Sequence, residues 1–246
     1  MRQNNFAGGN LTGPNAKIAF LHLHKTGGTS FDAFLRRILP THRFAPRDGA
    51  GKIDPAALDA GYDAYSGHYR AADMASLPTD LIKVTILREP TERLLSHYYF
   101  HKSYRVENIA RFGRPLLLKT KTSSLGLLLE DAEYVDFYSR FYVKALDPDY
   151  RGHGKPSLER ALDFLSGFDA IGVTSRLQTL MAQVAARLGA SLPGDAPMLN
   201  SRKALEDLDG FEKAAIEPLT AAQLARIEDI VGEDRILYDF ALTRAM

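Results

Sequence analysis

Short apolar runs alternate with longer amphipathic segments along this chain. The runs at 17–23 and 81–87 are almost continuously hydrophobic, which is typical of strands that are buried on both faces of a sheet. Strands that alternate with helices predict an α/β fold with a mostly parallel central sheet flanked by helices. The predicted strands are 17–23, a short one that ends at Gly67-His68, 81–87, and one at the start of 168–189.

The helices are predicted from periodicity and from their end signals. A first helix is expected from about Thr29 to Leu39, before Pro40, and a second begins at Pro90, where a missing N–H costs little. The aromatic residues of 134–142 recur at helical spacing and favour a core position. Further helices are expected in 168–189 and as a final pair from about Thr220 to the end, with Gly232 between them. The basic segment 101–122 is predicted to be a loop or lid.

Composition limits the classes of protein that need to be considered. The chain has 246 residues, of which 45% are hydrophobic, and a formal net charge of +1, so no nucleic-acid partner is indicated. It contains no cysteine, which excludes disulfides and thiolate chemistry. No run is long and apolar enough for a membrane span, and we expect a cytoplasmic protein. Residues 1–15 are predicted to be a disordered leader and 16–246 one domain.

A lysine and two glycines follow the first predicted strand, in the stretch FLHLHKTGGTSF. Backbone N–H groups at the start of the next helix attract an anion, and Gly27 and Gly28 allow the backbone to curl around one. Lys25 adds a positive charge, while Thr29 and Ser30 add hydroxyl donors. In the usual nucleoside triphosphate loop the lysine follows the glycines, whereas here it precedes them.

Two stretches of this sequence resemble the motifs of sulfotransferases that use 3′-phosphoadenosine 5′-phosphosulfate (PAPS). FLHLHKTGGTSF is similar to their 5′-phosphosulfate loop, with His24 in place of the usual proline, and VTILREPTERLLSHYYF is similar to their 3′-phosphate motif. The resemblance extends from about 17 to 174 and is closest to the carbohydrate branch with the heparan 2-O-sulfotransferases and bacterial members. It implies a P-loop-like sulfotransferase fold that binds PAPS and releases the 3′,5′-bisphosphate (PAP). The implied cofactor-binding residues are Lys25, Thr26, Gly27, Gly28, Thr29, Ser30, Arg88 and Ser96.

His68 is the candidate catalytic base, with Lys25 as the second catalytic residue. A histidine can accept a proton at neutral pH, and Gly67 leaves room for a close approach. The resemblance implies a His-Gly-His pattern here, but Ser66 replaces its first histidine. Asp32 is the rival base, and His22 or His24 could assist. The pairs His22/His24 and His97/His101 have the spacing of metal ligands, but no metal is expected, since sulfuryl transfer needs none.

The acceptor side is less defined by the sequence. A basic cluster could bind an acidic or hydroxylated sugar chain, or could simply be solvated. The resemblance implies a hydroxylated acceptor, either a carbohydrate or a glycolipid. The basic cluster comprises Arg105, Arg111, Arg114, Lys119 and Lys121, and Thr174, Ser201 and Arg202 are possible nucleotide contacts.

The leading hypothesis is therefore a PAPS-dependent sulfotransferase that sulfates a carbohydrate or glycolipid hydroxyl with a histidine base. One alternative is a nucleotide-dependent kinase or other phosphotransferase, which would bind ATP with magnesium instead. Another is a non-catalytic glycan- or anion-binding protein that retains the fold.

Overall fold

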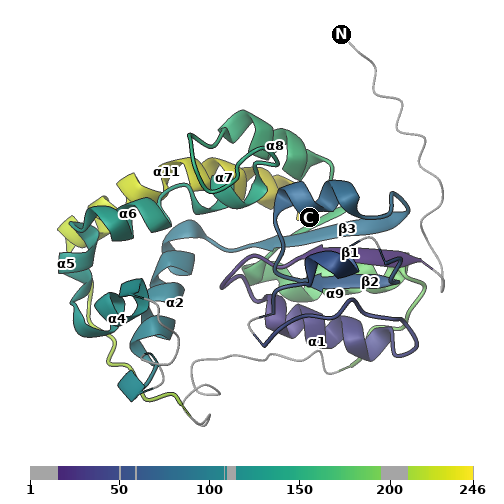
Figure 1. The fold of residues 1–246 in the computed structure, drawn as a ribbon, viewed down its shortest axis with the longest axis horizontal. Coiled ribbons are helices and arrows are strands. Elements are labelled where there is room, and N and C mark those ends of the chain that lie inside the picture. The colour runs from purple at the N-terminus through teal and green to yellow at the C-terminus, as the bar shows by residue number, and fades with distance from the viewer. Residues whose placement is uncertain are drawn as a thin grey trace.

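The central element of the structure, a computed structural model, is a parallel sheet of four strands in the order β2-β1-β3-β4 (Figure 1). The structure describes residues 16–49, 51–58, 60–107, 109, 115–194 and 210–245. The strands are β1 (Lys17–Leu21), β2 (Ala64–Gly67), β3 (Leu81–Leu87) and β4 (Ala170–Val173). The predicted α/β fold with a mostly parallel sheet is confirmed. The predicted leader, 1–15, lies outside the described residues.

The register brings the carboxyl ends of the strands to one edge of the sheet. Leu21, the last residue of β1, pairs with Gly67 of β2 on one side and with Thr85 of β3 on the other. On the other side of β3, Leu87 pairs with Val173, the last residue of β4. The segments that follow the strands therefore start close together, although they are far apart in the sequence.

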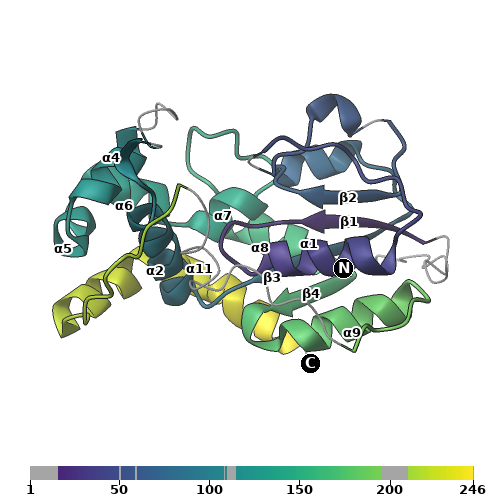
Figure 2. The same ribbon diagram turned by 90° about the horizontal axis from the view of Figure 1, so that it is seen from below.

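Helices cover both faces of this sheet because successive strand residues point to opposite sides. Ile18 and Phe20 pack on one face with α1 (Gly28–Ile38) and α9 (Leu177–Arg187), which lie side by side in Figure 2. Ala19 and Leu21 pack on the other face. That face is covered by α7 (Phe141–Leu146), α8 (Leu158–Ser166), the C-terminal half of α11 (Ala221–Arg244) and the 3₁₀ helix Ala71–Ser76. Two further 3₁₀ helices span Pro55–Ala57 and Thr174–Arg176.

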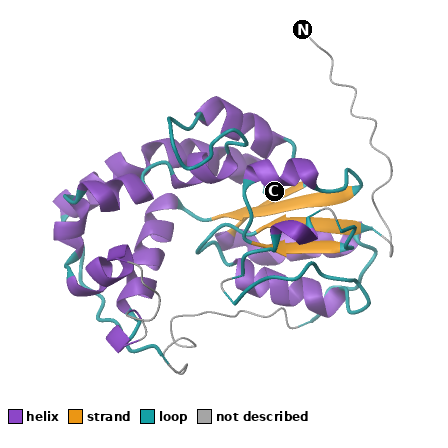
Figure 3. Ribbon diagram, in the orientation of Figure 1, coloured by secondary structure: helices purple, strands orange, loops and turns teal. Residues whose placement is uncertain are grey.

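A helical lobe extends from the sheet beyond β3 (Figure 3). Its core combines α2 (Pro90–Lys102), α5 (Leu125–Leu129), α6 (Ala132–Tyr138) and the N-terminal half of α11, with α4 (Pro115–Thr122) packed on α2. Tyr134 and Tyr138 are fully buried here and Tyr142 is fully buried against the sheet, which confirms the core position for the three tyrosines of the stripe, whereas Phe137 is exposed. At 1.5 Å per residue α11 is about 36 Å long, so it can belong to both the lobe and the sheet.

Two predictions about helices are wrong. The basic segment is not a loop throughout, because 115–122 forms α4, with Leu117 and Thr120 buried. The final pair of helices is instead the single helix α11, which continues through Gly232. Buried residues on both sides of this glycine, Val231 and Asp234 among them, hold the helix together, so tertiary packing overrides the weak local propensity of glycine.

We expect Gly232→Ala to stabilise the protein. Gly232 is exposed in the middle of α11, and nothing lies within 4 Å of an added Cβ atom, so the change removes only the entropic disadvantage of glycine. The free energy of unfolding should rise by about 0.5–1 kcal/mol in urea denaturation. Gly67→Ala is the contrasting variant, because its Cβ would lie 2.6 Å from the carbonyl oxygen of Gly51. A decrease in stability for Gly232→Ala would contradict a continuous α11.

Candidate active site

The loop after β1 is shaped by two left-handed residues and a closely packed glycine. Lys25 has φ of 67° and Gly27, the N-cap of α1, has φ of 87°. A Cβ atom on Gly28 would lie 2.0 Å from Cδ2 of His22, so only glycine fits beside this ring. The N–H groups of Gly28 and Thr29, the first two of α1, precede the hydrogen bond from Ser30 to the carbonyl of Gly27 and lie at the positive end of the helix. The loop therefore has the backbone geometry of an anion cradle.

Lys25 and Arg88 lie close enough to affect each other's charge. Burial, and secondarily the charge of Arg88, lowers the pKa of Lys25 to about 8. The Lys25 ammonium lies over the ring of Phe100 on α2, 3.8 Å from its centroid, in a cation–π contact. An anion bound between the two cations would favour the charged lysine, and would therefore bind most tightly below about pH 8.

The hydroxyl groups of the cradle are not equally placed for binding an anion. Thr26 is buried, and its hydroxyl donates to the carbonyl of Leu23 at 2.9 Å, so it points into the loop. Thr174 donates to the carbonyls of Thr26 at 2.7 Å and of Leu87 at 3.2 Å, which joins the loop to the end of β3. Thr29 is exposed and Ser30 is buried. Thr26 can therefore contact a bound anion through its backbone N–H group but not through its hydroxyl.

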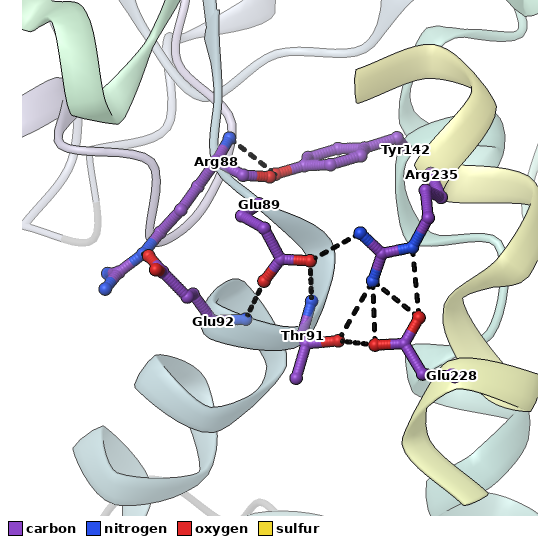
Figure 4. A network of polar contacts seen from close by, with 7 residues as sticks. All are labelled: Arg88, Glu89, Thr91, Glu92, Tyr142, Glu228 and Arg235. Carbon is purple, nitrogen blue, oxygen red and sulfur yellow. Dashed lines mark hydrogen bonds and ion pairs between the residues drawn. The ribbon is translucent and has the colours of Figure 1, made fainter. Parts of the chain in front are cut away.

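Arg88 follows β3 directly, and its backbone is held by Tyr142 (Figure 4). Its guanidinium contacts Glu92 through Nε, 3.2 Å from Oε2. The Glu92 side chain is 62% exposed, so this ion pair is weak. Ser96 is half-buried two turns further along α2. The contact leaves the two Nη atoms of Arg88 for another anion.

His68 lies at the end of β2 with a defined orientation. Its Nδ1 is 2.5 Å from the carbonyl oxygen of His22 and can only donate to it. The neutral ring consequently carries its proton on Nδ1 and a lone pair on Nε2. Burial lowers the pKa of His68. The hydrogen bond to His22 opposes this effect, and the charge of Arg47 adds to it. The imidazole is therefore neutral and able to accept a proton at physiological pH.

Five histidine rings form a continuous chain of contacts around this position. His68 lies 4.3 Å from His22 and 3.8 Å from His24, between ring centroids. His24 approaches His97 at 6.3 Å, and His97 lies 4.3 Å from His101. Burial first, and then neighbouring positive charges, holds the pKa values of His22 and His97 well below the usual range. In the part of the chain that the structure describes, no three histidine or acidic side chains are arranged to hold a metal ion.

Asp32, the rival base, is engaged in ion pairs. Its carboxylate accepts from Arg47 at 2.7 Å, from Arg36 at 3.1 Å and from the hydroxyl of Ser66 at 2.6 Å. Burial opposes its ionisation, but the bonds from Arg47 and Ser66 outweigh that effect and lower its pKa. Such a carboxylate is a poor proton acceptor. Ser66 stands where the similar sulfotransferases have the first histidine of a His-Gly-His pattern. Its hydrogen bond to Asp32 joins β2 to α1.

Three residues of the basic cluster are engaged in contacts within the protein. Lys119 pairs with Asp131, and Lys121 pairs with Glu212. Arg105 donates through Nε to the carbonyl of Phe211 at 3.1 Å. These contacts support a structural role for the three residues. Arg111, Arg114, Ser201 and Arg202 lie outside the described residues.

A comparison with protein families agrees with this geometry. A model of the sulfotransferase family matches residues 10–238, so the chain belongs to that family, whose members are transferase enzymes acting on hydroxylated acceptors. A comparison with curated proteins gives no match. Within the described residues, no helix is long and apolar enough to cross a membrane.

Several residues of the site were missed by the sequence reasoning. Phe100 lies one helical turn after Ser96, so its place on the same face of α2 could have been inferred. Tyr142 and Arg47 contact the site residues across long stretches of sequence, and no local signal announces those contacts.

We expect the ring of His68 to titrate below its ordinary pKa of about 6.5 and to carry its proton on Nδ1 when neutral. Nitrogen-15 NMR of the imidazoles distinguishes the two tautomers and gives the titration midpoint. The spectrum of His68→Gln assigns the signal. A neutral ring protonated on Nε2 would contradict the contact with His22, and a midpoint above 6.5 would contradict the lowering of the pKa by burial.

Proposed function

We propose that this protein transfers a sulfuryl group from PAPS to a hydroxyl of an acceptor. The observation that carries the proposal is the convergence of Lys25 and Arg88, which follow different strands at one edge of the sheet. Burial, and secondarily the charge of Arg88, lowers the pKa of Lys25 to about 8. Two separate cationic positions at one sheet edge suit a nucleotide that carries charge at both its 5′ and 3′ positions. The family match supports sulfuryl transfer.

The residues of the two loops fit such a nucleotide. The N–H groups at the start of α1, with Lys25, would hold the 5′-phosphosulfate, and Gly28 lets this helix start pack closely against the ring of His22. The two Nη atoms of Arg88 would bind the 3′-phosphate, with Ser96 as a further donor. When bound, PAPS supplies an activated sulfuryl group. We assign Thr26, Gly27, Thr29 and Ser30 to the same cradle, Thr26 through its backbone.

The reaction needs a base and a stabilised leaving group. His68 would receive the acceptor proton at Nε2, because its Nδ1 is committed to the carbonyl of His22. The acceptor oxygen forms the new bond to sulfur while the bond from sulfur to the bridging phosphate oxygen breaks. Lys25 and the N–H groups of α1 would stabilise the negative charge that leaves with PAP. Asp32 is a poorer base, because the bonds from Arg47 and Ser66 occupy its oxygens and lower its pKa.

We propose a carbohydrate or glycolipid as the acceptor, on the basis of the sequence resemblance. Phe137, whose side chain is next to His97 and 42% exposed, could stack on a sugar face near the histidine chain. The cytoplasmic location and the single domain over 16–246 stay predictions.

We expect PAP to bind at least tenfold more tightly than AMP in titration calorimetry at pH 7, where Lys25 is charged. The difference measures recognition of the 3′-phosphate, since a hydrogen bond to a charged group contributes about 1.5–3 kcal/mol. Arg88→Ala should bring the two affinities together. Arg105→Ala is the matched control, because this arginine contacts Phe211 outside the site.

A preference for ATP with magnesium would contradict the proposal and favour the kinase alternative. Failure to bind any of the three nucleotides would favour an anion- or glycan-binding protein without this donor.

We expect His68→Gln to bind PAP with unchanged affinity but to lose transfer by about a hundredfold or more, as is typical when a general base is removed. Transfer is measured as radioactive sulfate carried from PAPS to a panel of glycans and glycolipids. In the wild type the acidic limb of the rate should lie below pH 6.5, because the pKa of His68 is lowered. His42→Gln serves as a control, since that ring contacts the backbone of Ala16 instead. Loss of PAP binding in His68→Gln would indicate a structural role.

A further inference from the structure

We propose that Tyr142 is a positioning residue that fixes the backbone of Arg88 for recognition of the 3′-phosphate, with Arg235 anchoring the turn that follows. This inference rests on the proposed function, because it concerns how the same phosphate site is held. Figure 4 shows the residues involved: Arg88, Glu89, Thr91, Glu92, Tyr142, Glu228 and Arg235.

The Tyr142 hydroxyl bonds both backbone groups of one residue. It accepts from the N–H of Arg88 at 2.8 Å and donates to its carbonyl oxygen at 2.7 Å. Leu87 is the last residue of β3 in the sheet ladder, so Arg88 is the first residue that the ladder no longer holds. Polar backbone groups at such a position need other partners, and a single phenol supplies both. Burial also raises the pKa of Tyr142, so the hydroxyl keeps its proton.

Tyr142 is itself held rigidly. Its side chain is fully buried, and its backbone N–H donates to Oδ1 of Asp234 at 2.8 Å, on α11. The same oxygen accepts from the N–H of Val143 at 3.3 Å, so Asp234 caps the start of α7. The buried Arg93 of α2 stacks on Phe141 of this turn, with its guanidinium carbon 3.7 Å from the ring centroid. The hydroxyl that contacts Arg88 is therefore fixed from both α2 and α11.

A second group of contacts anchors the turn after Arg88. Glu89 caps α2 by accepting from the N–H groups of Thr91 and Glu92 at 3.2 and 2.7 Å. Arg235, which follows Asp234 on α11, lies 2.8 Å from Oε1 of Glu89. It also contacts Thr91 and pairs with Glu228. The backbone of Arg88 and the turn that follows it are thus both tied to elements distant in sequence.

These contacts have a consequence for phosphate recognition. A guanidinium binds phosphate through two parallel hydrogen bonds only when its orientation is right, and displacement of a binding group by about 1 Å can be costly. Tyr142 and Arg235 do not touch the phosphate in this proposal. Their effect should therefore appear only in interactions that depend on Arg88, and not in those of the cradle at α1.

The test compares PAP with AMP by calorimetry in Tyr142→Phe, which removes one hydroxyl from the core and keeps the ring. We expect the affinity for PAP to fall about five- to tenfold, as for the loss of a hydrogen bond, while the affinity for AMP changes less than twofold. The matched control is Tyr138→Phe, a fully buried tyrosine on α6 whose hydroxyl lies beside Tyr134 and not at the backbone of Arg88. Thermal unfolding of both variants is measured to separate recognition from stability.

A double variant makes the assignment to Arg88 specific. In the Arg88→Ala background, Tyr142→Phe should have no further effect on PAP affinity, and Arg235→Met in the wild-type background should lower PAP affinity selectively, as Tyr142→Phe does. Equal losses for PAP and AMP, or a similar loss in Tyr138→Phe, would overturn the positioning role. A wild type that does not distinguish PAP from AMP would instead contradict the proposed function. If the wild type discriminates and Tyr142→Phe discriminates equally well, only the positioning role is wrong.

Discussion

The parallel pairing of β1 with both of its neighbours is the constraint on which the candidate site depends. Leu21, the last residue of β1, pairs with Gly67 at the end of β2 and with Thr85, two residues before β3 ends at Leu87. The loops that carry Lys25, His68 and Arg88 therefore leave the same edge of the sheet. In a parallel sheet each return to this edge requires a crossover through a helix or a long connection. The long separations between the motifs in the sequence are therefore a result of the topology that brings them together.

This convergence concentrates positive and titratable groups, and the protein limits the electrostatic cost in several ways. Burial and the charge of Arg88 make the ammonium of Lys25 less stable, while the face of Phe100 partly compensates. Asp32 neutralises Arg47 beside the histidine chain. The histidines remain neutral instead, as the lowered pKa of His68 indicates. Among the residues that the structure describes, Arg88 has only the exposed carboxylate of Glu92 as its ion-pair partner, so the pair of Lys25 and Arg88 suits the anionic donor proposed for this site.

Local sequence predicted those parts of the fold and site that local physics determines. The apolar runs located β1 and β3, and Pro40 and Pro90 located the end of α1 and the start of α2, because strand burial and helix ends depend on neighbouring residues. Long-range contacts escaped prediction. The sequence around Tyr142 does not indicate that its hydroxyl meets Arg88, nor does the sequence around Asp32 indicate Arg47. The continuity of α11 was missed for the same reason, since packing at Ile230 and Leu237 determines it.

The two halves of the proposed nucleotide site therefore have different structural origins. The cradle around Gly27 and Gly28 is set within a few residues, by a strand end and a helix start. The Arg88 half instead depends on α7 and α11, because its backbone is satisfied from Tyr142 and its following turn from Arg235. α11 also contributes to the hydrophobic cores of both the lobe and the sheet. Because one rigid helix serves both cores and the Arg88 turn, the packing of the lobe is physically coupled to the proposed 3′-phosphate position, whereas the lobe reaches the 5′ cradle through the contact of Phe100 with Lys25.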